Sequence, residues 1–368
     1  MSFSDQQQIT HNLLDELKTI RTQYRADCAE VEVLVKQFDK DVVDPALQQE
    51  FYDRMKSISL CCSESMSVFA SKIVERSVNL LCHQPPCDFE VIAIGSLARG
   101  EATPYSDLEY IFLIAQKTQE TMPFFELLAF TTYFIIGNLG ETKLSYMAIE
   151  ELRSWFEDKS KNGFKIDGLL EGAGNIPTGN GSEAKKNHFI VTPQELAERY
   201  RKVLHNPDPT ESVRGDLTAM LTYTKSLYTH NIEASNGEKG LREQFHESIV
   251  ALEPNEVRKD ANMTMLATDA KKFNFVPSRD LAQKGFNADV KKELYRFPSI
   301  LLLDICVVLG INGGTSWDSL DALTEQGHLS ADVSRTLKFL LAATTYIRLS
   351  AYLHHDAQDD RLSLAQHS

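Results

Sequence analysis

The sequence lacks any run of apolar residues close to the roughly 20 that a membrane-spanning helix needs. The apolar stretch Leu301–Leu309 is far too short. The amino-terminal residues also lack a basic stretch followed by an apolar one, so no secretory signal peptide is expected. We therefore expect a cytoplasmic protein that makes no use of a membrane, although the sequence is also compatible with delivery into another cell.

Cysteine is scarce, with six residues in a chain of 368. In a chain of this length without a secretion signal, they are expected to be free thiols in a reducing compartment. Cys82 and Cys87 flank a His-Gln-Pro-Pro sequence, but no second pair at the spacing of a zinc site follows. The cysteines therefore predict neither a disulfide framework nor a zinc site.

Positive charge is also scarce, and the formal net charge is −14. A protein that grips long DNA or RNA needs a broad basic surface, so no long nucleic acid is expected as a partner. A local basic pocket for a nucleotide stays compatible with this charge. Hydrophobic residues make up 42% of the chain, which is enough for a sizeable core, and the length favours two or three domains.

Two long helices are expected at the amino-terminal end. Apolar residues recur at helical spacing from Thr10 to about Phe38. Asp44 can cap a second helix that has Pro45 in its first turn and continues to about Leu81. We expect this hairpin to pack on the next domain or on a second subunit, which would make a homo-oligomer.

The centre of the chain, Val91–Ala115, predicts a buried strand, a turn beginning at Gly95-Ser96, and a second strand. Side chains alternate along a strand, so Asp107 and Glu109 should share one face while Leu108 lies on the other. Two neighbouring carboxylates at a buried strand repel each other. A divalent cation such as Mg²⁺ or Mn²⁺ would relieve that repulsion, since these ions prefer oxygen ligands.

The turn before these carboxylates has the residue types that a phosphate group needs. Gly95 permits close approach of the backbone, and Ser96 adds a hydroxyl donor. Arg99 has two alternatives, either to add positive charge at the same phosphates or to bind Glu101 structurally. Together with the two carboxylates, this pattern predicts a site for a metal ion and a triphosphate.

The later elements are expected to be a mixture of short strands and helices. Phe164–Asp167 alternates between apolar and polar residues, as a strand with one buried face does. Thr192-Pro193-Gln194-Glu195 has the residues of a capping box at the start of a helix. Buried or amphipathic helices are expected over 122–139, 217–232, 290–309, 316–325 and 331–354, and a short strand over 144–148.

The residues 95–114, GSLARGEATPYSDLEYIFLI, resemble the signature of nucleotidyltransferases related to DNA polymerase β. They are most similar to the branch of protein-PII uridylyltransferase and glutamine-synthetase adenylyltransferase. The resemblance implies that Asp107 and Glu109 bind the metal and that the NTP is bound by Gly95, Ser96, Arg99 and Ser106. Glu109 departs from the more common aspartate, and its longer side chain would shift the spacing of the metal.

The same resemblance implies a third carboxylate on a later strand, as a metal ligand or general base. Asp167 is the first choice and Glu171 the second, while Glu141 and Glu150 lie at expected element edges and are weaker. The alternative for Asp167 is a plain residue in a turn at the end of a strand.

Farther along, Leu303–Leu353 is similar to the helical substrate-binding domain found in bacterial members of this branch. We therefore predict an α+β protein with a small mixed-sheet nucleotidyltransferase domain at 87–190. A helical segment at 1–86 would precede it, and a helical substrate-binding domain at 191–368 would follow.

The expected reaction transfers a nucleoside monophosphate from ATP or UTP to an acceptor and releases pyrophosphate. A protein side chain is the expected acceptor, so the reaction would be adenylylation or uridylylation. Two alternatives are a nucleotidyltransferase that acts on a small molecule or an RNA 3′ end, and a catalytically silent nucleotide-binding module.

Overall fold

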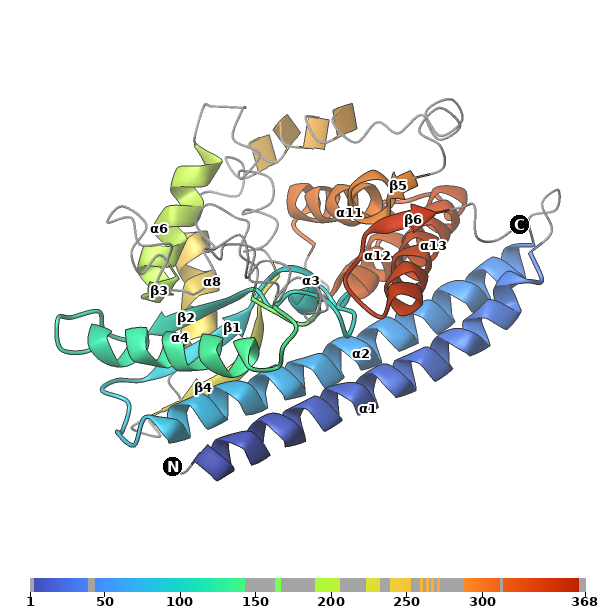
Figure 1. Ribbon diagram of the computed structural model, residues 1–368. Coiled ribbons are helices and arrows are strands. Elements are labelled where there is room, and N and C mark those ends of the chain that lie inside the picture. Colours follow the sequence, from blue (N-terminus) through green and yellow to red (C-terminus); the bar gives the residue numbers. More distant parts are fainter. Residues whose placement is uncertain are drawn as a thin grey trace. The chain divides into compact units, whose positions relative to one another are not determined.

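The computed structural model of the protein is an α+β structure that combines helices with a small four-stranded mixed sheet and a separate pair of short strands (Figure 1). This confirms the predicted fold class. The structure describes residues 3–38, 44–142, 163–166, 189–205, 223–231, 239–252, 259–260, 263–264, 266–267, 270–271, 287–311 and 314–363. Within these ranges, no helix is long and apolar enough to cross a membrane.

The chain forms two compact units, each built from separate stretches of sequence. The first contains Met1–Ile20, Glu64–Ala98 and Pro104–Pro254, and the second contains Arg21–Ser63, Arg99–Thr103 and Asn255–Ser368. The predicted division into three domains stays a prediction.

Two long helices supply residues to both units. They are α1 (Phe3–Val35) and α2 (Pro45–Leu80), close to the predicted ranges. Asp44 accepts a hydrogen bond from the Ala46 backbone nitrogen at 2.9 Å, which confirms it as the expected cap of α2.

The first unit is built around a four-stranded sheet in the order β3-β2-β1-β4. Its central strands are β1 (Phe89–Ala93) and β2 (Tyr110–Ile114), which pair antiparallel and are buried throughout. At one edge, β3 (Ile190–Val191) runs parallel to β2. At the other edge, β4 (Lys225–His230) runs antiparallel to β1.

Successive side chains of β1 meet different helices, as alternation along a strand requires. The Phe89 ring packs edge-on against Phe125 of α4 (Met122–Gly137), with ring centroids 5.3 Å apart. The next residue, Glu90, accepts a hydrogen bond from the Arg242 backbone nitrogen of α8 (Leu241–Leu252) at 2.9 Å. Helix α6 (Pro193–Leu204) packs against α8.

The capping box predicted at the start of α6 is confirmed. The Glu195 backbone nitrogen donates to Thr192 Oγ1 at 3.2 Å, and the Thr192 nitrogen donates to Glu195 Oε2 at 3.1 Å.

The structure corrects two expectations in this unit. The helix predicted over 217–232 is wrong where Lys225–His230 forms β4, because pairing with β1 decides the local structure. Helix α4 is less buried than expected, since Leu127, Phe130 and Phe134 are each more than half exposed. The strand predicted over 144–148 lies outside the described residues.

The second unit is mainly helical. A π-helical segment η2 (Val290–Tyr295) leads into α11 (Arg296–Leu309), and α12 (Ser316–Glu325) and α13 (Ala331–His355) follow. The predicted cap Ser330 accepts a hydrogen bond from the Val333 nitrogen at 3.4 Å. Two short strands, β5 (Asn287–Asp289) and β6 (Arg361–Ser363), form a separate pair. Trp317 of α12 is fully buried, and its ring centroid lies 5.5 Å from that of Tyr52 of α2.

A cluster of charges joins α2, α12 and α13 within this unit. The carboxylate of Asp321 lies 2.8 Å from Lys56 Nζ and 2.6 Å from Lys338 Nζ. Burial alone would raise the pKa of Asp321, but hydrogen bonds from the two ammonium groups lower it below its ordinary value. Because the folded-state pKa is lowered, this group stabilises the fold above its unfolded-state pKa, and that stabilisation is lost as the pH falls.

We predict that Asp321→Asn lowers the free energy of unfolding at neutral pH by about 1–3 kcal/mol, because it removes the negative charge and one of the two oxygens that accept hydrogen bonds from Lys56 and Lys338. The loss should shrink as the pH falls below the ordinary pKa of an aspartate, about 3.9, because the wild-type protein then loses the stabilisation that its charged carboxylate supplies. Urea denaturation at pH values above and below this pKa measures the effect. Asp332→Asn, whose carboxylate pairs with Arg335 at the exposed surface, is the control and should change little.

Candidate active site

The strand pair β1–β2 brings the predicted phosphate and metal residues to one end of the sheet. Ala93 pairs with Tyr110, and the Ile94 nitrogen donates to the Glu109 carbonyl oxygen at 3.0 Å. The next residue along is Gly95, which begins the short helical turn α3 (Gly95–Ala98). Glu109 therefore lies opposite Ile94, and its carboxylate lies against the neighbouring Gly95.

Gly95 is held by two independent constraints. Its φ of +66° lies in the left-handed region, which residues with a Cβ rarely adopt. In addition, a Cβ at this position would overlap the Glu109 carboxylate. The backbone at Gly95 and the carboxylate of Glu109 are thus in direct contact, which no larger residue would permit without a shift.

The segment Asp107-Leu108-Glu109 alternates as predicted. Leu108 is 1% exposed, while its two acidic neighbours are partly exposed. The Leu108 nitrogen donates to the Lys165 carbonyl oxygen at 2.7 Å, and Leu108 forms a parallel bridge with Ile166. Since paired residues share a face, Lys165 lies on the same side as Asp107 and Glu109.

Lys165 is a residue of this site that the sequence analysis missed. Its Nζ lies 3.7 Å from Asp107 Oδ1, and only 22% of its side chain and 13% of that of Asp107 are exposed. The alternation in Phe164–Asp167 was the available signal, because it puts residue 165 on the polar face. The ammonium group of Lys165 supplies positive charge beside Asp107, and an opposite charge at this distance favours the ionised form of a carboxylate.

The residues present fit a magnesium ion that is coordinated partly by the protein and partly by oxygen atoms of a bound substrate. Two hard carboxylates on one face, Asp107 and Glu109, match the one or two protein carboxylates that Mg²⁺ takes alongside phosphate oxygens. Within the described ranges, no group of three or more His, Cys, Asp or Glu side chains forms a complete protein cage for a metal. Asp167, Glu171 and Glu150 lie outside the described residues, so the third carboxylate stays a prediction.

Glu141, one of the two weaker choices for the third carboxylate, binds the segment that contains Lys165 through hydrogen bonds. Its Oε2 accepts a hydrogen bond from the Phe164 nitrogen at 2.7 Å, and its carbonyl oxygen accepts one from Gly163 at 3.1 Å. The Phe164 ring packs edge-on against Phe69 of α2, with centroids 5.3 Å apart. These contacts hold residues 163–166 beside the acidic pair.

Of the remaining predicted nucleotide-binding residues, Ser96 is partly exposed and Ser106 is 4% exposed. Arg99 adopts the second of its two alternatives, with its Nε 3.0 Å from Glu101 Oε2. Burial would lower the pKa of Arg99, but the Glu101 carboxylate more than offsets this and raises it. Whether Arg99 also acts on phosphates stays a prediction.

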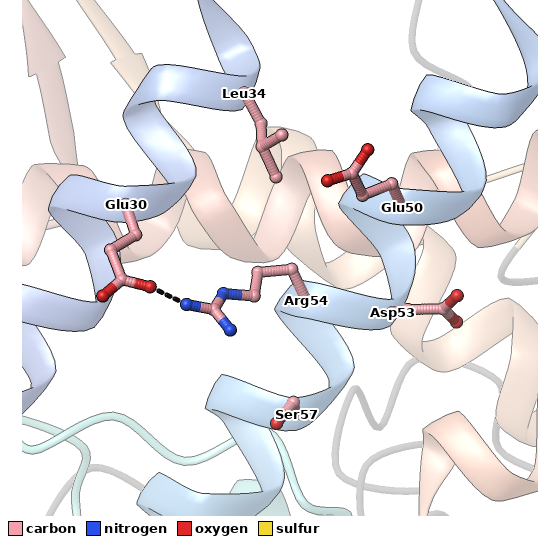
Figure 2. Close-up of a pocket in the computed structure, with 6 residues that line it drawn as sticks. All are labelled: Glu30, Leu34, Glu50, Asp53, Arg54 and Ser57. Carbon is pink, nitrogen blue, oxygen red and sulfur yellow. Dashed lines mark ion pairs between the residues drawn. The ribbon is translucent and has the colours of Figure 1, made fainter.

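A hollow between α1 and α2 in the second unit is a poor alternative for a nucleotide (Figure 2). Among the described residues that line it, Arg54 is the one cation, and it forms an ion pair with Glu30. The other lining residues are Leu34, Glu50, Asp53 and Ser57. Three carboxylates around one paired arginine would repel a triphosphate.

Comparison with known proteins supports a nucleotidyltransferase. The model of the family described as putative nucleotidyltransferase DUF294 matches residues 46–139. The matched range contains most of α2, the whole β1–β2 hairpin with Gly95, Asp107 and Glu109, and α4. The match supports the superfamily and a transferase activity in general, and it does not distinguish the branch of protein-PII uridylyltransferase. No curated protein matches the chain.

We predict that Gly95→Ala destabilises the protein more than Gly140→Ala does. Gly140 also has a positive φ, of +76°, but a Cβ there would meet no atom within 4 Å. Both variants carry the backbone cost of about 1–2 kcal/mol, and only the first must also displace the Glu109 carboxylate. Urea denaturation measures both, and equal losses would contradict the contact between Gly95 and Glu109.

Proposed function

We propose that this protein transfers a nucleoside monophosphate from an NTP to an acceptor and releases pyrophosphate. The observation that carries the proposal is the placement of Asp107 and Glu109 on one face, directly across the hairpin from Gly95-Ser96. The family match over residues 46–139 includes this hairpin, which supports the same reaction class.

Asp107 and Glu109 would hold Mg²⁺, or Mn²⁺ in its place. When bound, the metal would neutralise charge on the triphosphate and polarise the phosphate under attack. Gly95 lets the chain approach the phosphates without a side chain in between, and Ser96 offers its hydroxyl as a donor. In this proposal, Arg99 and Ser106 belong to the nucleotide side, as the resemblance of the sequence implies.

Lys165 keeps a positive charge beside Asp107. In the protein without nucleotide, its ammonium group offsets the repulsion between the two carboxylates. Asp167, or otherwise Glu171, is proposed to complete the acidic set or to accept the proton of the attacking group.

The proposed acceptor is a side chain of another protein, with ATP or UTP as the NTP. The support is the resemblance to the protein-modifying branch and the net charge of −14, which does not favour a long nucleic acid. A small molecule or an RNA 3′ end is the alternative acceptor. Incubation with labelled NTPs and mass spectrometry of the products distinguishes them, because label found only in RNA would contradict the protein acceptor.

A catalytically silent nucleotide-binding module is the second candidate function. The observation that favours it is that the described residues supply two carboxylates and a lysine, and no larger acidic group. Such a module would bind an NTP with metal and would release no pyrophosphate in the presence of any acceptor.

We predict that Asp107→Asn lowers pyrophosphate release from NTP by at least about a hundredfold, because the loss of a metal-binding carboxylate removes several kcal/mol of charge stabilisation. Glu109→Gln should have a similar effect. Glu120→Gln, which changes an exposed carboxylate before α4, is the control and should keep wild-type activity. Each of the four NTPs is tested with Mg²⁺ or Mn²⁺, and wild-type levels of release by Asp107→Asn would contradict the assignment.

A further inference from the structure

A short connector joins the two halves of the proposed site in sequence. Arg99–Thr103 follows the turn that contains Gly95-Ser96 and precedes the stretch that leads to Asp107. Both neighbours of this connector belong to the first compact unit, but the connector itself belongs to the second, together with α11, α12 and α13.

Helix α12 and the residues around it hold the connector backbone. The Ser316 nitrogen donates to the Arg99 carbonyl oxygen at 3.0 Å, and Trp317 Nε1 donates to the Gly100 carbonyl oxygen at 2.9 Å. Gly100 has a φ of +73°, and a Cβ there would lie 2.8 Å from Leu60 and 3.1 Å from Thr315. The connector therefore fits closely against its neighbours and can move little without them.

The side chain of Glu101 is the centre of this anchorage. It is 1% exposed, and its carboxylate accepts hydrogen bonds from the Tyr295 hydroxyl and from Ser299 Oγ at 2.9 Å. The Arg99 guanidinium forms an ion pair with the same carboxylate. A buried ion pair often stabilises a fold no more than a well-packed apolar cluster does. We therefore expect the pair of Arg99 and Glu101 to matter chiefly because it fixes the position of the connector.

We propose that Glu101 is a positioning residue, through which α11 and α12 set the geometry of the hairpin that carries Gly95-Ser96 and Asp107. This inference rests on the proposed function as regards activity, but not as regards the order of the hairpin. The hairpin closes at the hydrogen bond from Ile94 to Glu109, and the residues between them form the short helix α3 followed by a loop. Anchoring the middle of such a loop removes most of its alternative conformations.

The affinity for NTP should depend on the fraction of molecules in which the loop is ordered. A ligand that needs one loop conformation binds more weakly in proportion to the fraction of molecules that have another. Loosening the connector should therefore raise the KM for NTP. The chemical step of the molecules that do bind should change little, because Asp107 and Glu109 are untouched.

Tyr295→Phe tests this with a matched control, Tyr352→Phe. Both tyrosines are buried in the second unit, and the Arg348 guanidinium lies 4.4 Å from the Tyr295 ring and 5.2 Å from the Tyr352 ring. The Tyr295 hydroxyl bonds Glu101, whereas the Tyr352 hydroxyl donates to Asp360 at 2.5 Å and accepts from Arg348 at 3.1 Å. Each variant deletes one buried hydroxyl, but only the first one touches the connector.

Hydrogen exchange of the amides in residues 94–109 is the first measurement, and the kinetic constants for NTP are the second. We expect Tyr295→Phe to speed exchange there by about tenfold and to raise KM about fivefold or more, with kcat within about twofold of wild type. Tyr352→Phe should leave both unchanged. Equal effects of the two variants, or none from Tyr295→Phe, would overturn the proposal.

Ser299→Ala gives a second variant if Tyr295→Phe fails to fold, since it removes another hydroxyl donor of Glu101. It should speed exchange in the same residues, and normal exchange would count against the positioning role. If the wild-type protein released no pyrophosphate, the proposed function would fail, while the exchange measurement would still decide whether Glu101 orders the hairpin.

Discussion

The contact between the Glu109 carboxylate and the Gly95 backbone is the constraint on which the proposed site depends. A Cβ at Gly95 would have to displace this carboxylate, and the contact places the turn that begins with Gly95-Ser96 against the acidic end of the next strand. The β1–β2 pairing sets this register through the hydrogen bond from Ile94 to Glu109. A triphosphate on the turn and a metal on the carboxylates would then share one small space, as nucleotidyl transfer requires.

The buried carboxylate of Glu101 is a second constraint on the hairpin, because it holds the connector in place. Burial would raise its pKa, but Arg99 and the hydrogen bonds from Ser316 and Tyr295 lower it below the ordinary value, so Glu101 is charged at neutral pH. A charged group held by several donors has one low-energy arrangement. The hydrogen bonds from Tyr295 and Ser299 connect the middle of the hairpin to the C-terminal helices, and we propose that those helices influence the site through this anchorage.

The strand, turn and strand of the site could be predicted from the sequence because their signals are local. Leu108 is apolar between two acids, and that alternation is enough to place both carboxylates on one face. The position of Lys165 beside Asp107 depends on a parallel bridge between distant segments, which no local pattern reveals. Strand β4 was missed for the same reason, since Lys225–His230 becomes a strand by pairing with β1.

A crystal structure with Mn²⁺ and a non-hydrolysable NTP would test this site most directly, because the anomalous signal of manganese locates the metal independently of the nucleotide. We expect a metal ion bound by Asp107 and Glu109, with the triphosphate against Gly95-Ser96. A nucleotide bound elsewhere, or a metal–triphosphate complex that touches neither carboxylate, would contradict this expectation.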